Sequence, residues 1–441
     1  MMDTCVIPLG DAANADRFIL YRPLAGLAFV GNRAMANLAR AGETAVRAAN
    51  SDVHEFLRAI GFYEPDPPAP EPPGADFRPT TAVLLLTNQC QLRCTYCYTS
   101  AGELPRQQLS FELGRAAIDY VCQIASELGQ SQFEVSFHGG GEPTYAWRVL
   151  TACTDYARRR SLPAKIRLTS NGLWSARQCA WIIDQLDGLS LSLDGSPETQ
   201  NRQRPLASGR PSSPQVMRTV AELDRRAFPY GIRMTATAPW SNFPRDVRFL
   251  CGETQCESMQ VEPAFSSARG GPGQPDAAEA QAFVEAFLEA FDVASSHGRR
   301  LLYSGARLGT VTTAFCAAPF SALIVNANGE LVTCYEIAGP AHPLAGRSVI
   351  GRIENGNVVL DRAARARLHA LLQERRDTCR DCFCYWSCAG DCYPRVFGRE
   401  AGAHLRHSPR CEINRSITRQ LLLRRIADSG GVWRETLRRA Q

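Results

Sequence analysis

The sequence predicts an α/β protein: a partial (β/α)6 barrel, preceded by a small α+β module and followed by a cysteine-rich domain. Three observations support this prediction. Short apolar runs alternate with helix-like segments through the middle of the chain, a proline-rich stretch precedes them, and most of the 17 cysteines gather in two spaced sets. A chain of 441 residues is long enough for roughly two or three domains.

The first boundary lies at a run of prolines between residues 65 and 74, which suits neither a helix nor a central strand. We expect a small module over 1–64 and an extended linker over 65–79. Within the module, the apolar pattern predicts strands at 17–21 and 27–30 and helices at 34–39 and 53–60. Such a winged-helix-like unit resembles the leader-peptide recognition module of peptide-modifying enzymes, and it fits a subdomain that caps the barrel equally well.

Six continuous apolar runs predict the buried parallel strands of the barrel, at 81–86, 133–137, 166–169, 189–193, 232–236 and 259–261. Helices are expected between these strands, at 110–128, 146–159, 175–186, 214–226 and 244–251. A longer helix at 276–299 closes this domain, which we place at 80–305. Functional sites on such sheets lie at the carboxyl ends of the strands. We therefore expect the site at that edge.

Three cysteines follow the first strand, at Cys90, Cys94 and Cys97. Thiolates this close in sequence can converge on one soft metal centre, and a set of three leaves a position for another ligand. The CxxxCxxC spacing resembles the signature of the radical S-adenosylmethionine (SAM) superfamily. That resemblance implies a TIM-like partial barrel with a 4Fe-4S cluster, on whose open iron SAM is cleaved to a 5'-deoxyadenosyl radical. For the cysteines alone, a zinc knuckle is the alternative.

Further motifs follow the next strands. Gly-Gly-Gly-Glu-Pro comes after the second strand, Thr-Ser-Asn-Gly after the third and Ser-Leu-Asp-Gly after the fourth. The resemblance implies that these turns bind the amino group and ribose of SAM and that a downstream arginine binds its carboxylate. The expected SAM contacts are Tyr96, Gly140, Gly141, Glu142, Pro143, Ser170, Asn171, Ser192, Asp194 and Arg204. For Arg204, a surface position in a polar loop is the alternative.

The second cysteine set lies between residues 315 and 411, where the chain reads as irregular, as in small metal-stapled modules. Its spacing resembles the SPASM domain, which we place at 306–412, and implies two auxiliary 4Fe-4S clusters. The outer cluster is assigned to Cys379, Cys382, Cys388 and Cys411, and the inner one to Cys316, Cys334 and Cys392. A zinc ribbon is the alternative. The remaining 413–441 is expected to form a helical segment, with a basic amphipathic helix at 413–426.

The cysteines assigned to the inner cluster do not match the full cysteine pattern of the SPASM domain. Relatives with full coordination carry another cysteine a few residues after the first, whereas this chain has Ala317 to Ala322 without one. The inner cluster therefore has an open iron or takes a different fourth ligand. Cys384 is either that ligand or a bystander, and we favour a bystander because the outer pattern is complete without it.

The resemblance covers roughly residues 80–411 and implies an oxidoreductase that modifies peptides. We expect a maturase of a ribosomally made precursor peptide, in which hydrogen abstraction leads to a C–C or C–heteroatom crosslink or another oxidation. A base must then take a proton, and the candidates are Glu262, Glu336, Tyr335 and His138. An anaerobic sulfatase-maturing, formylglycine-forming enzyme is the alternative. Such enzymes usually carry an aspartate directly after the cysteine that corresponds to Cys334, where this chain has Tyr335 and then Glu336.

Composition narrows the class of protein. The net charge of +5 is mild for this length and the arginines are scattered, so we expect no nucleic-acid partner. The sequence shows neither a signal segment nor an apolar run that could span a bilayer, so we expect a cytoplasmic protein without membrane contact. The expected partners are a precursor peptide with its leader and an electron donor such as flavodoxin or ferredoxin. A non-catalytic iron-sulfur electron carrier or redox-sensing regulator is the alternative of another class.

Overall fold

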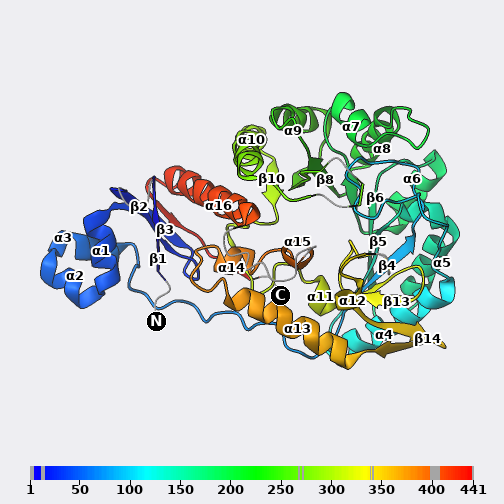
Figure 1. Cartoon of the computed structure of the whole chain (residues 1–441), viewed down its shortest axis with the longest axis horizontal. Helices are drawn as coiled ribbons and strands as arrows, with labels where there is room; N and C mark the ends of the chain where they lie inside the picture. Colours follow the sequence, from blue (N-terminus) through cyan, green and yellow to red (C-terminus); the bar gives the residue numbers. More distant parts are fainter. Residues whose placement is uncertain are drawn as a thin grey trace.

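The computed structural model describes residues 4–10, 15–266, 269–270, 273–337, 339, 342–397 and 408–439. Its main body is a sheet of 11 strands in which the predicted barrel strands follow one another in sequence order, each parallel to the next (Figure 1). These strands are β4 (Thr81–Thr87), β5 (Phe133–Gly140), β6 (Ala164–Ser170), β7 (Gly188–Ser192), β8 (Tyr230–Ala236) and β9 (Ser258–Pro263). A seventh parallel strand, β10 (Arg300–Tyr303), extends the series beyond β9. The partial α/β barrel predicted from the sequence is confirmed.

Helices cover the outer face of this sheet, where the sequence predicts them. They are α4 (Phe111–Glu127), α5 (Trp147–Arg158), α6 (Ala176–Gln185), α8 (Ser213–Arg225), α9 (Asn242–Glu253) and α10 (Ala277–Ser296). The hydroxyl of Ser110 accepts from the backbone N–H of Leu113 and fixes the start of α4. Two short helices were not predicted: α7 (Pro197–Gln203) follows β7, and the 3-10 helix η1 (Pro143–Ala146) follows β5.

The expectation of an irregular chain from 315 to 411 is wrong for much of that region. Strand β12 (Ala322–Val325) joins the main sheet parallel to β4, and three antiparallel strands continue the sheet beyond it: β13 (Glu330–Val332), β14 (Val349–Glu354) and β15 (Asn357–Leu360). All four residues of β12 are buried, which explains why Ala-Leu-Ile-Val forms a strand here. Helix α13 (Arg362–Asp377) follows, and four shorter helices are α11 (Ala318–Ser321), α12 (Ala345–Ser348), α14 (Tyr385–Cys388) and α15 (Tyr393–Phe397).

The N-terminal module contains the expected strands and helices, together with elements that the sequence did not reveal. Its sheet has the order β1 (Cys5–Pro8), β2 (Arg17–Arg22), β3 (Leu27–Asn32) and β16 (Val432–Arg434), so its fourth strand comes from the far end of the chain. Three helices follow β3: α1 (Arg33–Ala41), α2 (Glu43–Ala49) and α3 (Ser51–Ala59). The segments predicted at 1–64 and 413–441 therefore share one structural unit.

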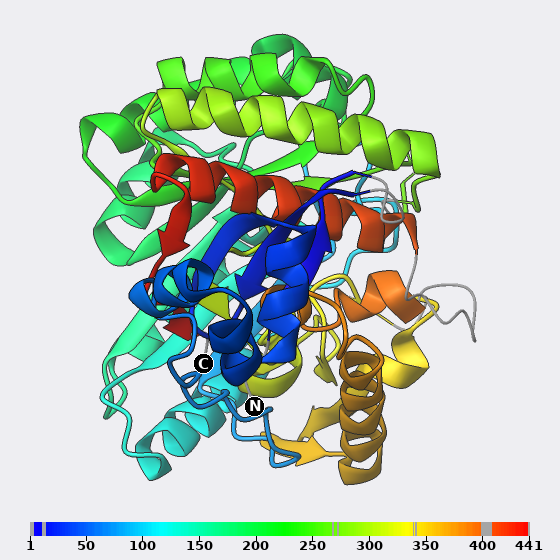
Figure 2. The same cartoon turned by 90° about the vertical axis from the view of Figure 1, so that its left-hand side faces the viewer.

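The C-terminal helix α16 (Pro409–Asp428) packs against both parts of the molecule. Leu422 and Ile426 of α16 share an apolar cluster with Ile19 and Tyr21 of β2. The same helix contacts α10 of the barrel, and Figure 2 shows it running between α10 and the N-terminal sheet. After β16, the two-residue strand β17 (Arg438–Arg439) pairs with β11 (Thr310–Val311). The C-terminal segment thus joins the N-terminal module to the rest of the protein.

The proline-rich linker lies along the cysteine-rich domain (Figure 1). The buried guanidinium of Arg22 is 2.6 Å from the carboxylate of Asp66 at the start of the linker. Farther along, the hydroxyl of Thr313 donates to the carbonyl of Glu71, and His369 contacts the carbonyl of Pro73 at 2.9 Å. These contacts fix the path of the linker. Within the described ranges, no helix combines the length and the apolar character that a bilayer span requires.

Candidate functional site

The first cysteine set lies on the loop after β4 and faces a central cavity of about 1070 Å³. Backbone hydrogen bonds fix this loop, because the N–H groups of Arg93 and Thr95 donate to the carbonyls of Pro205 and Gln203. Burial raises the pKa of the Cys94 thiol to about 11. A soft metal that replaces the proton removes this penalty, so three neighbouring thiols, of which Cys94 is buried and Cys90 and Cys97 are half-buried, suit an iron-sulfur centre. Among the described side chains, no three His, Cys, Asp or Glu converge on a point suited to a single metal ion.

The glycine turn after β5 packs directly against the cysteine loop. A Cβ atom on Gly141 would lie 2.2 Å from the carbonyl oxygen of Gln89, so only glycine permits this approach. The N–H of Glu142 donates to the same carbonyl. Gly140 has φ +85°, a conformation that favours glycine. Gly140, Gly141 and Glu142 all line the cavity. The glycines expected at the SAM amino group therefore have a structural role as well.

The buried carboxylate of Glu142 joins the turn to the end of β6. Its oxygens accept from the Ser170 hydroxyl at 2.6 Å, the Thr144 hydroxyl at 2.8 Å and the Asn171 N–H at 2.9 Å. Asn171 links this carboxylate to the first cysteine, because its side-chain amide lies 3.7 Å from the sulfur of Cys90. The Glu-Pro and Ser-Asn motifs thus form one hydrogen-bonded unit beside the first cysteine.

The carboxylate of Asp194, after β7, is surrounded by donors. It accepts from the N–H of Thr235 at 2.9 Å, from the amide of Gln203 at 2.7 Å and from the hydroxyl of Tyr96. The guanidinium of Arg204 lies 3.0 Å from it, and a second nitrogen of Arg204 is 3.9 Å from the sulfur of Cys94. Burial is the main cause that raises the pKa of Tyr96. Both oxygens of Asp194 are therefore engaged by the protein, and this residue positions Tyr96 and Arg204.

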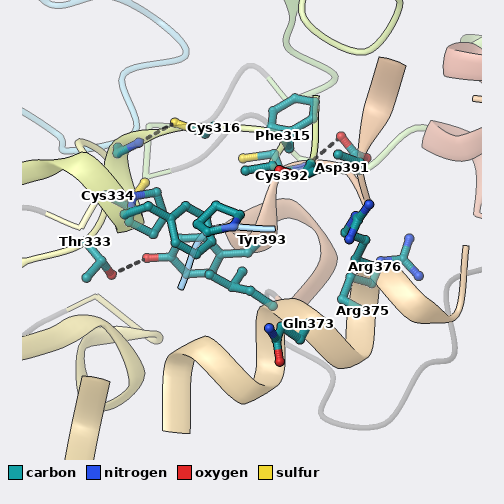
Figure 3. Close-up of a pocket in the computed structure, with 18 of the residues that line it drawn as sticks. Phe315, Cys316, Thr333, Cys334, Gln373, Arg375, Arg376, Asp391, Cys392 and Tyr393 are labelled. Carbon is teal, nitrogen blue, oxygen red and sulfur yellow. Dashed lines mark hydrogen bonds between the residues drawn. The ribbon is translucent and has the colours of Figure 1, made fainter. Parts of the chain in front are cut away.

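The cysteines assigned to the inner cluster face the same central cavity as the first set. Cys316, Cys334 and Cys392 line it, and they also line an adjoining pocket of about 70 Å³ (Figure 3). The hydroxyl of Tyr393 fixes this wall, because it lies 2.9 Å from the Thr333 hydroxyl and 3.0 Å from that of Ser348. Burial is the main cause that raises the pKa of Cys334, and the neighbouring thiols of Cys392 and Cys316 raise it further. One cavity thus connects two cysteine sets more than 200 residues apart in sequence.

The cysteines assigned to the outer cluster line a separate cavity of about 290 Å³: Cys379, Cys382, Cys388 and Cys411. Two nitrogen donors face these sulfurs, with Arg375 at 3.8 Å from Cys411 and Asn414 at 3.5 Å from Cys388. Nitrogen donors near cysteine sulfurs suit the thiolates of an iron-sulfur cluster. Cys384 also lines this cavity, and hydrogen bonding with its thiol lowers the pKa of Cys382. The structure thus places Cys384 with the outer set and away from the inner one.

All four candidate bases line the central cavity, but each is constrained differently. Glu336 makes a two-point ion pair with Arg395, at 3.1 and 3.0 Å. His138 stacks on Tyr335 with ring centroids 4.3 Å apart, and burial lowers the pKa of His138 to about 3. Glu262 is less constrained than Glu336, because the one cation paired with it in the described part of the chain, Arg410, is 3.9 Å away and lies closer to Asp391.

Sequence reasoning missed two features of this cavity. Arg233 projects from β8 into it, and Tyr98 lies between the first and the inner cysteine sets, since its electrostatic neighbours include Cys97 and Cys334. An arginine inside an apolar strand, as in Ile-Arg-Met, was the available signal for Arg233. Tyr98 directly follows the third cysteine and gave no separate signal.

Comparison with known proteins gives an independent view of the same region. Residues 84–238 match the family model described as the radical SAM superfamily. The chain is 27% identical over 158 residues to the uncharacterized protein MJ0907 of Methanocaldococcus jannaschii, covering 35% of this chain and 52% of that protein. It is 22% identical over 270 residues to the sporulation killing factor maturation protein SkfB of Bacillus subtilis, covering 58% of this chain and 60% of that protein. The chain thus matches about half of these relatives' length.

Two solved structures share the fold. The structure of anSMEcpe with bound AdoMet has a TM-score of 0.61 at 15% identity and covers 79% of this chain and 99% of its own. SuiB of Streptococcus suis, bound to the precursor peptide SuiA, has a TM-score of 0.53 at 14% identity and covers 83% of this chain and 80% of its own. At these identities the likeness shows the fold alone.

Proposed function

We propose, from the premise that residues 84–238 form a radical SAM domain, that this chain is a radical SAM maturase of a ribosomally made peptide. One observation carries the proposal: a single large cavity is lined by both the first cysteine set and the inner set. Such a cavity lets a substrate residue reach both sets. The partial match to SkfB, a maturation protein, supports a peptide as the substrate.

When bound, a 4Fe-4S cluster on Cys90, Cys94 and Cys97 supplies the electron that splits SAM into methionine and a 5'-deoxyadenosyl radical. The chain's own groups hold the reactants. Arg204 is fixed by Asp194 beside Cys94, where a guanidinium can pair with the carboxylate of SAM. Asn171 and Ser192 line the cavity and offer small polar groups to the ribose. Tyr96 is fixed through its hydroxyl to Asp194.

Crosslinking or another two-electron oxidation requires that the substrate lose a hydrogen atom, an electron and, where a bond forms, a proton. We assign the role of proton acceptor to Glu262, because of the two carboxylates among the candidate bases it makes the longer ion pair, 3.9 Å to Arg410 against 3.0 Å between Glu336 and Arg395. The electron needs an acceptor. The remaining cysteines fit two further 4Fe-4S clusters that could take it, one on Cys316, Cys334 and Cys392 and one on the four outer cysteines. The three inner thiols leave one iron position to another ligand.

The alternative of sulfatase maturation gains no support from the residue after Cys334. Tyr335 occupies that position and stacks on His138, and Glu336 is held by Arg395. Neither offers a free carboxylate. For the maturase, we propose a substrate with a leader segment, an electron donor of the flavodoxin or ferredoxin type and a cytoplasmic location, since reduced thiols need a reducing compartment.

The test uses anaerobically reconstituted full-length protein with SAM, dithionite and the peptide encoded by the neighbouring short reading frame. We expect 5'-deoxyadenosine and a change in peptide mass, and neither with Cys94→Ala. Deoxyadenosine without any change in the peptide would point to a different substrate. Zinc in place of iron, or clusters without SAM cleavage, would overturn the proposal and favour the zinc or electron-carrier alternatives.

A further inference from the structure

One part of the central cavity is unusually rich in arginine. Ten arginines line the cavity against five carboxylates, counting described residues. Six of these arginines have no ion-pair partner in the described part of the chain: Arg233, Arg299, Arg300, Arg307, Arg425 and Arg438. Two cavity carboxylates lie close to these arginines along the chain, Asp428 near Arg425 and Glu435 near Arg438. The described carboxylates of the cavity therefore do not neutralise the positive charge of its arginines.

Five of these arginines belong to segments at the side of the barrel nearest the N-terminal module, and we call them the arginine wall: Arg299, Arg300, Arg307, Arg425 and Arg438. Two of them also donate to backbone carbonyls, Arg299 to those of Thr254 and Gln255 and Arg307 to those of Ser387 and Phe315. Several contacts bring their segments together. Arg424, beside Arg425 on α16, pairs with Asp292 of α10 at 2.8 Å, and α10 leads directly to Arg299. The N–H of Arg438 donates to the carbonyl of Gly309. Figure 1 shows β10 between α10 and α16 on this side of the barrel.

Strand β10 gives the arginine wall an open edge. It is the last strand of the 11-stranded sheet and pairs with β9 on one side, and no other described strand pairs with its second side. Its residues alternate, with Leu301 and Tyr303 buried and Arg300 and Leu302 exposed. An edge strand of this kind can bind an extended peptide through backbone hydrogen bonds and alternate side chains.

The part of the cavity wall beside β10 is apolar. Leu302 is 46% exposed, and Phe291 and Leu308 also line the cavity. Exposed apolar side chains rimmed by charges mark binding surfaces for partly apolar ligands. A peptide that alternates acidic and less polar side chains matches both the arginines and this apolar part. A nucleic acid matches the charge but not the strand edge, and the chain's mild net charge of +5 gives it little further support.

We propose that the arginine wall and the open edge of β10 bind an extended, acidic segment of the substrate peptide and direct the adjoining residue toward the first cysteine set. This inference rests on the proposed function and adds a substrate class to it. Arg300 and Arg425 pair with Asp or Glu side chains of the segment, and Leu302 contacts the residue between them. Arg233, which lines the same cavity from β8, faces the part of the peptide that reaches the reaction site.

Binding is measured by fluorescence anisotropy with a labelled 12-residue peptide in which glutamate and threonine alternate, compared with its twin in which glutamine replaces glutamate. The reconstituted full chain is expected to bind the glutamate peptide at least tenfold more tightly, with an affinity that falls as salt rises. The double variant Arg300→Gln, Arg425→Gln should bind the glutamate peptide at least fivefold more weakly. Arg177→Gln with Arg218→Gln, exposed positions outside the cavity, removes the same charge and should leave binding unchanged. Equal binding of the two peptides, or equal loss in both double variants, overturns the inference.

A second measurement needs no variant. Hydrogen exchange of residues 300–303 should slow when the glutamate peptide is added, and should not change with the glutamine peptide. An unlabelled oligonucleotide that displaces the peptide and protects the same residues more strongly would favour a nucleic-acid ligand and contradict the inference. Formation of 5'-deoxyadenosine is recorded in parallel. If SAM is cleaved but the acidic peptide neither binds nor protects β10, the inference fails and the proposed function stands; if SAM is not cleaved, the proposed function fails.

Discussion

The guanidinium of Arg204 lies 3.0 Å from the carboxylate of Asp194, and both side chains are buried beside the first cysteine set. The pair links the end of β7 to the residue that follows α7. Asp194 also fixes Tyr96 and Gln203, so a single carboxylate organises one wall of the cavity. Buried pairs of this kind are costly to break because the remaining charge has no solvent to stabilise it.

Asp194→Asn should therefore lower the free energy of unfolding by about 3–5 kcal/mol, since it leaves Arg204 as an uncompensated buried cation. Urea unfolding followed by circular dichroism measures the change. Asp184→Asn is the matched control: Asp184 pairs with Arg226 at 2.8 Å, but its side chain is 54% exposed. That exposed pair contributes about 1 kcal/mol or less. Equal destabilisation by both variants would contradict the role given to Asp194.

Gly141→Ala should displace the cysteine loop. Its Cβ would lie 2.2 Å from the carbonyl oxygen of Gln89, and backbone atoms cannot move aside as a side-chain end can. We expect deoxyadenosine formation to fall by about tenfold or more, which corresponds to about 1.4 kcal/mol at the transition state. Gly252→Ala in α9 is the control, because a Cβ there meets nothing within 4 Å. Normal cleavage in Gly141→Ala would show that the loop does not depend on this contact.

Cys384→Ala should leave the iron content unchanged, although Cys384 lines the outer cavity. Four other thiols already surround that cavity, which is enough for one 4Fe-4S cluster. Cys388→Ala, four residues later, should remove about four irons per chain. Iron analysis together with electron paramagnetic resonance distinguishes the two variants. Loss of iron from Cys384→Ala, with none from Cys388→Ala, would reverse the assignment.

His138→Phe should preserve modification of the peptide within about threefold, because a phenyl ring maintains the stack on Tyr335. His138→Ala should lower the free energy of unfolding by at least about 0.5–1.5 kcal/mol, the contribution of a ring pair. Product mass and deoxyadenosine, measured in the same reaction, check the activity of His138→Phe, and urea unfolding checks the stability of His138→Ala. If His138→Phe still cleaves SAM but makes no product, His138 is the base after all, and the assignment to Glu262 is wrong.

The elements of the barrel were predictable because continuous apolar runs and helix-like segments are local signals. Ser110 illustrates this, since it caps α4 as the sequence predicts. The strand β12 was missed because four apolar residues between cysteines resemble a loop in a metal-stapled module, and its pairing with β4 joins residues about 240 positions apart. Nothing local in the sequence specifies such a pairing.

In the candidate site, too, features with a local sequence signal were predictable and features that depend on long-range packing were not. The first and inner cysteine sets line one cavity and the outer set lines another, and their assignment to three clusters stays a prediction. The expected contacts with SAM stay predictions. The sequence did not reveal that Asp194 is surrounded by donors from β8, the first cysteine loop and α7, since those contacts depend on packing between distant segments. Arg233 was missed although its place inside an apolar strand was a local signal.

The pairing of β16 with β3 has a consequence for biosynthesis. The N-terminal sheet lacks its fourth strand until residues 432–434 have left the ribosome, and its apolar cluster also requires Leu422, Ile426 and Trp433. Domains near the start of a chain commonly fold while translation continues. Here the first strands to be synthesised must wait for nearly the last, so the nascent chain carries an unpaired β-edge while the whole barrel is synthesised.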